Sequence, residues 1–174
     1  MKQLGGTDLK RLHRSWRQRT DGRLALLLDS VQTPFNVGAI LRTAAAMRVD
    51  HLWLCGATAP PTHERTKRTA LGTERYLTWD VVADPVTAAS AAREDGYRVV
   101  GIELADSALP IHQVDLGDDV CLALGHEDRG LSAGLLGACD AVAFIPQLGR
   151  VGSLNVANAA AIAMYEARRR HWGA

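Results

Sequence analysis

Cysteine is scarce in this 174-residue sequence, which contains only Cys55, Cys121 and Cys139. Their number is odd, they lie far apart in the sequence, and they occur in or beside apolar segments. Neither a disulfide framework nor a metal-ligand spacing fits this pattern, so we expect reduced core thiols and no bound metal.

Long hydrophobic segments are also missing. No apolar run approaches the roughly 18–20 residues that cross a bilayer. Residues 1–20 are polar and basic, without the apolar centre of a signal peptide. Both absences predict a cytoplasmic protein without membrane association. A length of 174 residues suits a single folded domain with a sizeable core, and an apolar content of 47% is typical of a soluble globular protein.

The chain has little net charge, at +1, and aromatic residues make up only 5% of it. The charge is unevenly distributed: residues 1–23, 63–75 and 168–170 are basic, whereas residues 80–128 are rich in carboxylates. One interpretation is that the basic segments form one side of the protein, which faces a polyanion. The other is a solvated N-terminal helix plus a C-terminal helix whose last arginines complement its dipole. The sequence leaves both open.

Apolar segments typical of buried strands alternate with segments of helical periodicity. The pattern predicts strands at 24–28, 51–55, 76–82, 97–104, 119–124 and 141–145. It predicts helices at 6–19, 37–47, 62–70, 84–95, 132–136 and 153–170. This alternation predicts one α/β domain over residues 1–174, with a mostly parallel sheet, helices on both faces, and residues 1–22 as a basic helical extension.

Three strand–loop–helix junctions carry glycines and polar side chains. Asn36-Val37-Gly38 follows the first strand, Leu124-Gly125-His126-Glu127 follows the fifth, and the segment from Ile145 to Asn155 follows the last. Ligand sites in open α/β sheets lie beyond the carboxyl ends of strands, where helix N-termini offer free N–H groups. The three junctions therefore predict one composite site.

The same junctions carry the residues of a known family. Asn36-x-Gly38-Ala39-Ile40-x-Arg42-Thr43-Ala44, Leu124-Gly125-x-Glu127-x-x-Gly130-Leu131-Ser132 and Ile145-Pro146-x-x-Gly149-x-x-x-Ser153-Leu154-Asn155-Val156 resemble the three motifs of the SpoU–TrmH family. That family comprises RNA ribose 2′-O-methyltransferases of the SPOUT class. The resemblance implies a C-terminal deep trefoil knot, S-adenosylmethionine as cofactor, and a homodimer.

The resemblance also implies a cofactor site. Residues that match the motifs at backbone and apolar cofactor contacts are Gly125, Ile145 and Leu154. Looser candidates are Ile102, Glu103 and Gln147. Gln147 stands where many relatives have methionine, which puts a side-chain contact at this position in doubt.

Catalytic roles follow from the same resemblance. Arg42 matches the family's essential arginine and would grip a phosphate beside the reacting hydroxyl, because a guanidinium stays charged and makes a poor base. Ser153 and Asn155 would orient the ribose or its phosphate, and Asn36 would hold Arg42 or the loop. The proton acceptor would be a phosphate oxygen, Glu127 or water.

Each of these residues also has an ordinary interpretation. Ser153 and Asn36 suit helix caps, Arg42 suits an exposed helix face, and Glu127 suits a solvated loop. A catalytically silent RNA-binding or assembly protein on the same scaffold is the main rival function. A dinucleotide-binding domain is less favoured, because no G-x-G-x-x-G follows the first strand.

RNA contacts are predicted from basic residues on two helices: Arg11, Arg14, Arg17, Arg19, Arg65, Lys67 and Arg68. Few aromatic residues lie near them in sequence, so we expect recognition through backbone charge and RNA shape rather than base stacking. Because many members that act on ribosomal RNA carry an extra N-terminal domain, a transfer RNA substrate is favoured over a ribosomal one.

Overall fold

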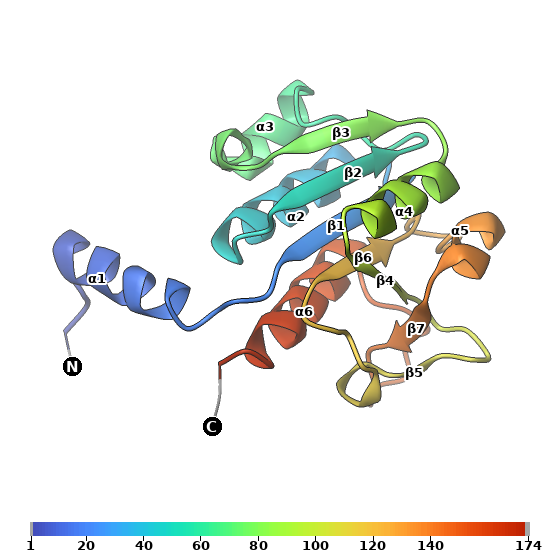
Figure 1. The fold of residues 1–174 in the computed structure, drawn as a ribbon. Coiled ribbons are helices and arrows are strands. Elements are labelled where there is room, and N and C mark those ends of the chain that lie inside the picture. Colours follow the sequence, from blue (N-terminus) through green and yellow to red (C-terminus); the bar gives the residue numbers. More distant parts are fainter. Residues whose placement is uncertain (1, 173–174) are drawn as a thin grey trace.

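One sheet organises the protein. The computed structural model describes residues 2–172, whose seven strands are all parallel and run in the order β3-β2-β1-β6-β4-β7-β5 (Figure 1). Their bounds are β1 Leu24–Asp29, β2 His51–Cys55, β3 Trp79–Val82, β4 Arg98–Ile102, β5 Leu109–Pro110, β6 Val120–Leu124 and β7 Ala141–Phe144. The predicted parallel sheet is confirmed.

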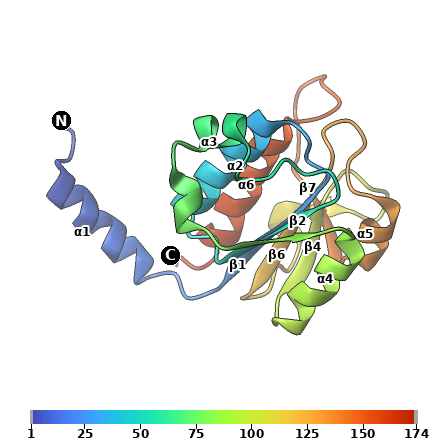
Figure 2. The same cartoon turned by 90° about the horizontal axis from the view of Figure 1, so that it is seen from above.

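Helices cover both faces of the sheet, as predicted (Figure 2). α2, α3 and α6 lie on one face, and α4 and α5 lie on the other. The helices are α1 Gly6–Arg17, α2 Pro34–Ala46, α3 Glu64–Ala70, α4 Pro85–Glu94, α5 Ala133–Ala138 and α6 Val156–Arg169, with 3₁₀ turns η1 Thr73–Tyr76 and η2 Ile111–Gln113.

The central strand β1 shows why the sequence specifies two apolar layers. Successive side chains of a strand point to opposite faces, so a strand buried on both faces is apolar throughout. Leu26 and Leu28 pack towards α2 and α6, whereas Leu27 packs towards α4 and α5. Cys55 and Cys121 are fully buried core thiols, as expected, and Cys139 is half-buried.

Several boundaries differ from the prediction. The strand predicted at 76–82 begins only at Trp79, because residues 73–76 form η1. The helix predicted from residue 153 begins at Val156, because the Asn155 side chain accepts hydrogen bonds from the N–H groups of Ala157 and Asn158 at 2.9 and 3.3 Å. Ser153 therefore lies in a loop rather than at a cap. β5 and η2 are too short to leave a periodic signal.

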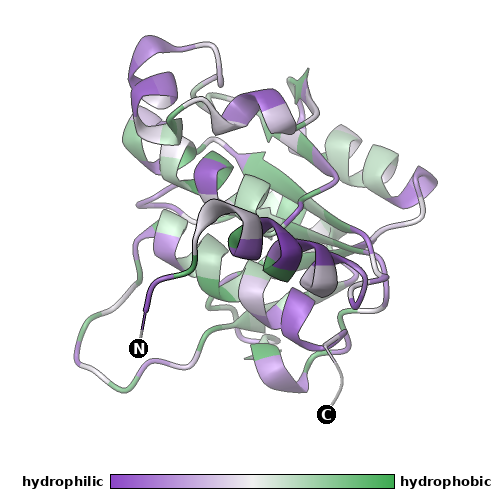
Figure 3. Ribbon diagram, turned by 90° about the vertical axis from the view of Figure 1, so that its left-hand side faces the viewer, coloured by the Kyte–Doolittle hydropathy of each residue, from purple (hydrophilic) through white to green (hydrophobic). Residues whose placement is uncertain are grey.

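The basic extension forms α1, which projects from the body beside the end of α6 (Figures 1 and 2). None of its residues is buried, and its apolar stripe Leu9, Leu12 and Trp16 stays about 40% exposed. Trp16 meets Trp172 edge to face, with ring centroids 5.3 Å apart. Figure 3 views the molecule from this side and shows hydrophilic and hydrophobic residues mixed along α1.

The arginines at the end of α6 are structural. Arg168 is 3% exposed, and its guanidinium donates hydrogen bonds to the carbonyls of Gly22, Met47 and Arg48 and lies 3.6 Å from Asp50. The next two arginines form ion pairs, Arg169 with Glu166 and Arg170 with Asp115. These three charges are therefore matched within the chain and do not form a free basic surface.

Candidate functional site

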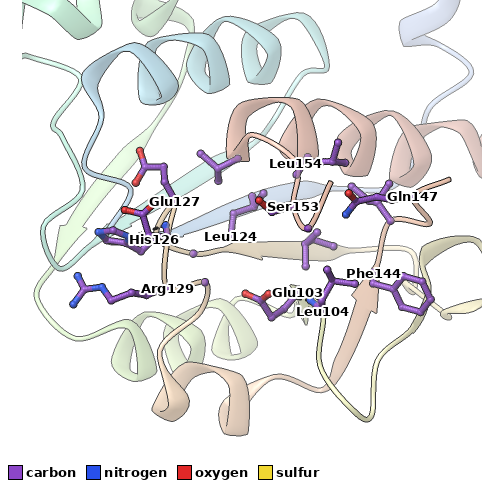
Figure 4. Close-up of a pocket in the computed structure, with 18 residues that line it drawn as sticks. Glu103, Leu104, Leu124, His126, Glu127, Arg129, Phe144, Gln147, Ser153 and Leu154 are labelled. Carbon is purple, nitrogen blue, oxygen red and sulfur yellow. Dashed lines mark hydrogen bonds between the residues drawn. The ribbon is translucent and has the colours of Figure 1, made fainter. Parts of the chain in front are cut away.

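A cavity of about 510 Å³ opens at the carboxyl edge of the sheet, where β4, β6 and β7 end (Figure 4). Its volume lies in the range of small-molecule sites. The loop before α6 closes one side, with Ser153 and Leu154, and the segment after β4 lies opposite, with Glu103 and Leu104. In residues 2–172 no group of histidine, cysteine and carboxylate side chains is placed to hold a metal ion, and no helix is long and apolar enough to cross a membrane.

The cavity wall brings together every residue that the sequence assigns to the cofactor. These are Ile102, Glu103, Gly125, Ile145, Gln147 and Leu154. They come from the end of β4 and from the segments that follow β4, β6 and β7, three neighbouring strands of the sheet. Parallel strands present their carboxyl ends at one edge, so residues after them converge although they lie far apart in sequence.

Glycine is required at two positions of the loop after β6. A Cβ on Gly125 would lie 2.1 Å from the carbonyl carbon of Gly130, because His126 and Gly130 exchange two backbone hydrogen bonds and close the loop tightly. Gly130 has a φ of +68°, and a Cβ there would lie 2.1 Å from a carboxylate oxygen of Glu103. The loop therefore keeps its shape only with glycine at both positions.

Two carboxylates anchor this loop from neighbouring strands. Glu103, just after β4, accepts hydrogen bonds from the N–H groups of Leu131 and Leu104 at 3.0 and 2.9 Å. Asp29, at the end of β1, is 4% exposed and accepts one from the N–H of Ser132 at 2.9 Å. Asp29 is not among the site residues predicted from the sequence. Its only signal is a lone carboxylate that ends an otherwise apolar strand.

A chain of side-chain hydrogen bonds connects the three predicted motifs. The Asn36 side-chain Nδ2 donates to Glu127 Oε1 at 2.9 Å, and the Asn155 side-chain Nδ2 donates to Asn36 Oδ1 at 3.0 Å. Glu127 also accepts from the backbone N–H groups of Gln32 and Thr33. The structure thus joins Asn36, Glu127 and Asn155 in one array, which we call the Glu127–Asn36–Asn155 array.

Glu127 is held as an anion. Partial burial on its own would raise the pKa of this carboxyl, but the hydrogen bonds from the side chain of Asn36, from its own backbone and from Thr33 lower the pKa to about 2. A carboxylate with this pKa and with three donors already bound is a weak proton acceptor near neutral pH.

Two further residues face the cavity without partners of their own. The Gln147 Oε1 atom is buried and has no hydrogen-bond donor among the described residues. Ser153 is exposed and lines the cavity mouth (Figure 4). A ligand that carries an amino group would supply the donor that Gln147 lacks.

Arg42 does not line this cavity. It lies in a second hollow of about 850 Å³, which we call the α1 groove because α1 forms one side of it. The other sides are the end of α2, η1 and the C-terminal segment. Residues of the α1 groove are His13, Trp16, Arg17, Thr20, Arg42, Ala45, Ala46, Met47, Arg48, Thr73, Tyr76, Arg168 and Trp172.

Of the predicted RNA contacts, only Arg17 is among the lining residues of this groove. The remaining six are exposed on the surfaces of α1 and α3 or just beyond α1: Arg11, Arg14, Arg19, Arg65, Lys67 and Arg68.

Comparison with known proteins identifies the family. Residues 23–165 match the model of the SpoU rRNA Methylase family. The chain belongs to this family. The match spans the sheet, the cavity and most of α6, and it excludes the dinucleotide-binding alternative.

Individual relatives fit the same assignment. The chain is 37% identical over 157 residues to the 23S rRNA (guanosine-2′-O-)-methyltransferase RlmB of Acinetobacter baylyi, covering 90% of this chain and 63% of that protein. It is 30% identical to the tRNA (guanosine(18)-2′-O)-methyltransferase of Escherichia coli, covering 87% and 65%. The AdoMet-bound rRNA methyltransferase of Sinorhizobium meliloti superposes with a TM-score of 0.80 and 33% identity, covering 87% and 58%. The chain thus spans about three fifths of these relatives' lengths.

Proposed function

We propose that the protein methylates a ribose 2′-hydroxyl in structured RNA, with S-adenosylmethionine as the methyl donor. The observation that carries this proposal is the cavity at the carboxyl ends of β4, β6 and β7, whose wall contains the three motif-matched cofactor residues and the three looser candidates. The relatives' names supply the reaction, and both ribosomal and transfer RNA occur among them. The protein would act in the cytoplasm.

The residues present suit S-adenosylmethionine. Ile102, Ile145 and Leu154 offer an apolar surface for an adenine ring, and the unpartnered Gln147 Oε1 offers an acceptor for an amino group. Glu103 adds a carboxylate at the same wall, which favours a positively charged sulfonium. When bound there, S-adenosylmethionine supplies an electrophilic methyl group for in-line displacement.

The protein's own contribution is to position the RNA hydroxyl and its proton. Ser153 at the cavity mouth is free to hydrogen-bond to the ribose or its phosphate. Glu127 is occupied by Asn36, Thr33 and Gln32, so we assign it to holding the loops in register rather than to accepting the proton. The proton then leaves to a phosphate oxygen of the RNA or to water.

Arg42 does not line the cavity of its own chain, and for this reason we propose a homodimer in which a second copy of the chain provides it. Large apolar side chains are exposed on the α2 and α6 side: Phe35 is 65% exposed, Ile162 43% and Tyr165 49%. Such a surface is typical of a protein interface. In this arrangement Arg42 of one protomer grips the RNA phosphate beside the cavity of its partner. We also propose that the C-terminal part of the chain forms the trefoil knot that the family implies.

Mixed dimers test the position of Arg42. One chain carries Arg42→Ala and the other carries Gly125→Val, and we expect each variant alone to be inactive. If Arg42 acts across the dimer, the mixed dimer contains one complete site and recovers methyl transfer. If Arg42 acts within its own chain, both sites of the mixed dimer stay defective and mixing restores nothing.

The activity itself is tested with S-adenosylmethionine carrying a labelled methyl group. The protein is incubated with unmodified transfer RNA and, separately, with unmodified ribosomal RNA. We expect label in RNA, with transfer RNA the better substrate. Saturable S-adenosylmethionine binding without transfer to either RNA would favour the catalytically silent RNA-binding protein instead.

A further inference from the structure

The α1 groove gathers aromatic rings and guanidinium groups that are distant in sequence. Trp16, Tyr76 and Trp172 come from α1, η1 and the C-terminal segment. Trp16 lies within the basic segment 1–23, and Tyr76 and Trp172 follow the basic segments 63–75 and 168–170. Only the fold brings these three rings to one hollow. Base stacking at this surface would add to the expected recognition through backbone charge and RNA shape.

Three of the four arginine charges that line the groove are uncompensated. Arg17, Arg42 and Arg48 are exposed, and none of them forms an ion pair among residues 2–172. No aspartate or glutamate is among the described residues that line the groove. Only the fourth arginine, Arg168, has a carboxylate partner, in Asp50. The groove therefore favours an anionic ligand.

The aromatic side chains are held in place rather than free. Trp172 donates from its indole N–H to the Thr20 hydroxyl at 3.0 Å and meets Trp16 and Tyr165 edge to face at 5.3 Å. The Arg75 guanidinium lies 4.7 Å from the ring centroid of Tyr76 and donates to its hydroxyl at 2.7 Å. Tyr76 is nevertheless 67% exposed. Fixed and exposed rings lose little conformational entropy when a ligand stacks on them.

We infer that the α1 groove is a subsite for an unstacked nucleotide of the substrate RNA, which lies beside the nucleotide that is methylated. Aromatic rings next to unpaired guanidinium groups match a nucleobase and its flanking phosphates. The groove volume of about 850 Å³ accommodates a ligand of this size. Because Arg42 is shared with the proposed reaction, this inference rests on the proposed function.

A second copy of the chain is the competing occupant. Burying three guanidinium groups against protein requires a carboxylate for each, because an unpaired buried charge is strongly destabilising. An RNA backbone supplies a phosphate at every nucleotide and requires no such matching. The charge pattern therefore favours RNA.

Tyr76→Ala is the most informative variant, because this exposed side chain contributes little to folding. The probe is a short single-stranded oligoribonucleotide that contains 2-aminopurine, whose fluorescence falls on stacking, and no S-adenosylmethionine is present. We expect Tyr76→Ala to weaken binding by about 5- to 150-fold and to abolish the quenching. Tyr76→Phe keeps the ring and should bind like the parent protein.

Arg48→Ala tests the electrostatic half of the inference. Its binding to the same probe should be weaker, and the slope of log affinity against log salt concentration should fall by about 0.7. Unchanged probe binding and quenching in Tyr76→Ala, with methyl transfer intact, would overturn the subsite. So would a change in dimer dissociation without a change in probe binding, since the second copy would then fill the groove. Loss of methyl transfer with normal probe stacking would count against the proposed function alone.

Discussion

Glu127→Gln is the substitution that most sharply distinguishes an organising carboxylate from a catalytic base. Glutamine keeps the length and shape of the side chain but places an N–H₂ group where the carboxylate now accepts from Asn36 and from the N–H groups of Gln32 and Thr33. At least one of these three donors then faces the N–H₂ group of the glutamine instead of an acceptor. The loop after β1 therefore loses part of its connection to the loop after β6.

The magnitude follows from the pKa of Glu127. If the whole fall of this pKa from 4.5 to about 2 contributed to folding, it would supply about 3.4 kcal/mol of free energy. The carboxylate is only partly buried, so solvent screening reduces this to about 1–2 kcal/mol. For a chain of this length we expect the melting temperature of Glu127→Gln to fall by about 2–8 °C at pH 7.

The pH dependence supplies the assay and its sign. Because the folded-state pKa of Glu127 lies below the unfolded-state value, its stabilisation is fully present above pH 4.5 and is lost as the pH falls towards 2. Urea unfolding of the parent and of Glu127→Gln should therefore differ at pH 7 and converge with acidification. Equal stability at pH 7, or a constant difference between pH 5 and pH 2.5, would refute the assignment.

Four further substitutions have definite expected outcomes. Gly125→Val should abolish S-adenosylmethionine binding in calorimetry and lower the melting temperature, because its Cβ collides with Gly130 at 2.1 Å. Arg42→Ala should reduce methyl transfer by about 100-fold or more and leave S-adenosylmethionine affinity unchanged. Gly38→Ala should cost about 1–3 kcal/mol in urea unfolding, because the new Cβ would lie 2.6 Å from the Thr66 carbonyl oxygen on α3. Arg168→Leu should cost about 3 kcal/mol in the same assay, because it leaves three carbonyls unpaired.

The outcomes that contradict these expectations are equally definite. Normal cofactor affinity in Gly125→Val would remove the loop after β6 from the cofactor site. Cofactor loss in Arg42→Ala would give that arginine a role in binding S-adenosylmethionine rather than RNA. Arg42→Lys is the matched control: it keeps the charge but not the planar fork, so it should recover only part of the activity.

The sequence specifies the cavity wall well, and for a physical reason. Ile102 ends its strand, Gly125 and Ile145 directly follow theirs, and a parallel sheet brings such positions to one edge. A strand pattern and three motifs are therefore enough to predict which residues line the cavity. The Glu127–Asn36–Asn155 array is less accessible, because hydrogen-bond direction depends on side-chain geometry that spacing does not encode.

The α1 groove shows what local patterns miss. Trp16, Tyr76 and Trp172 line one groove although α1, η1 and the segment after α6 are far apart in sequence, and no periodicity links these positions. Arg168 illustrates the same point: in sequence it belongs to a basic C-terminal cluster, yet it is buried and binds three carbonyls. The placement of Arg42 outside its own chain's cavity likewise depends on tertiary structure.

The position of the transferred methyl group tests the central claim most directly. RNA labelled by the protein from S-adenosylmethionine is hydrolysed with alkali, which cleaves only next to a free 2′-hydroxyl. We predict that the label appears in alkali-resistant dinucleotides, and that Arg42→Ala releases almost none. Label recovered on a base within mononucleotides would contradict ribose methylation at this cavity.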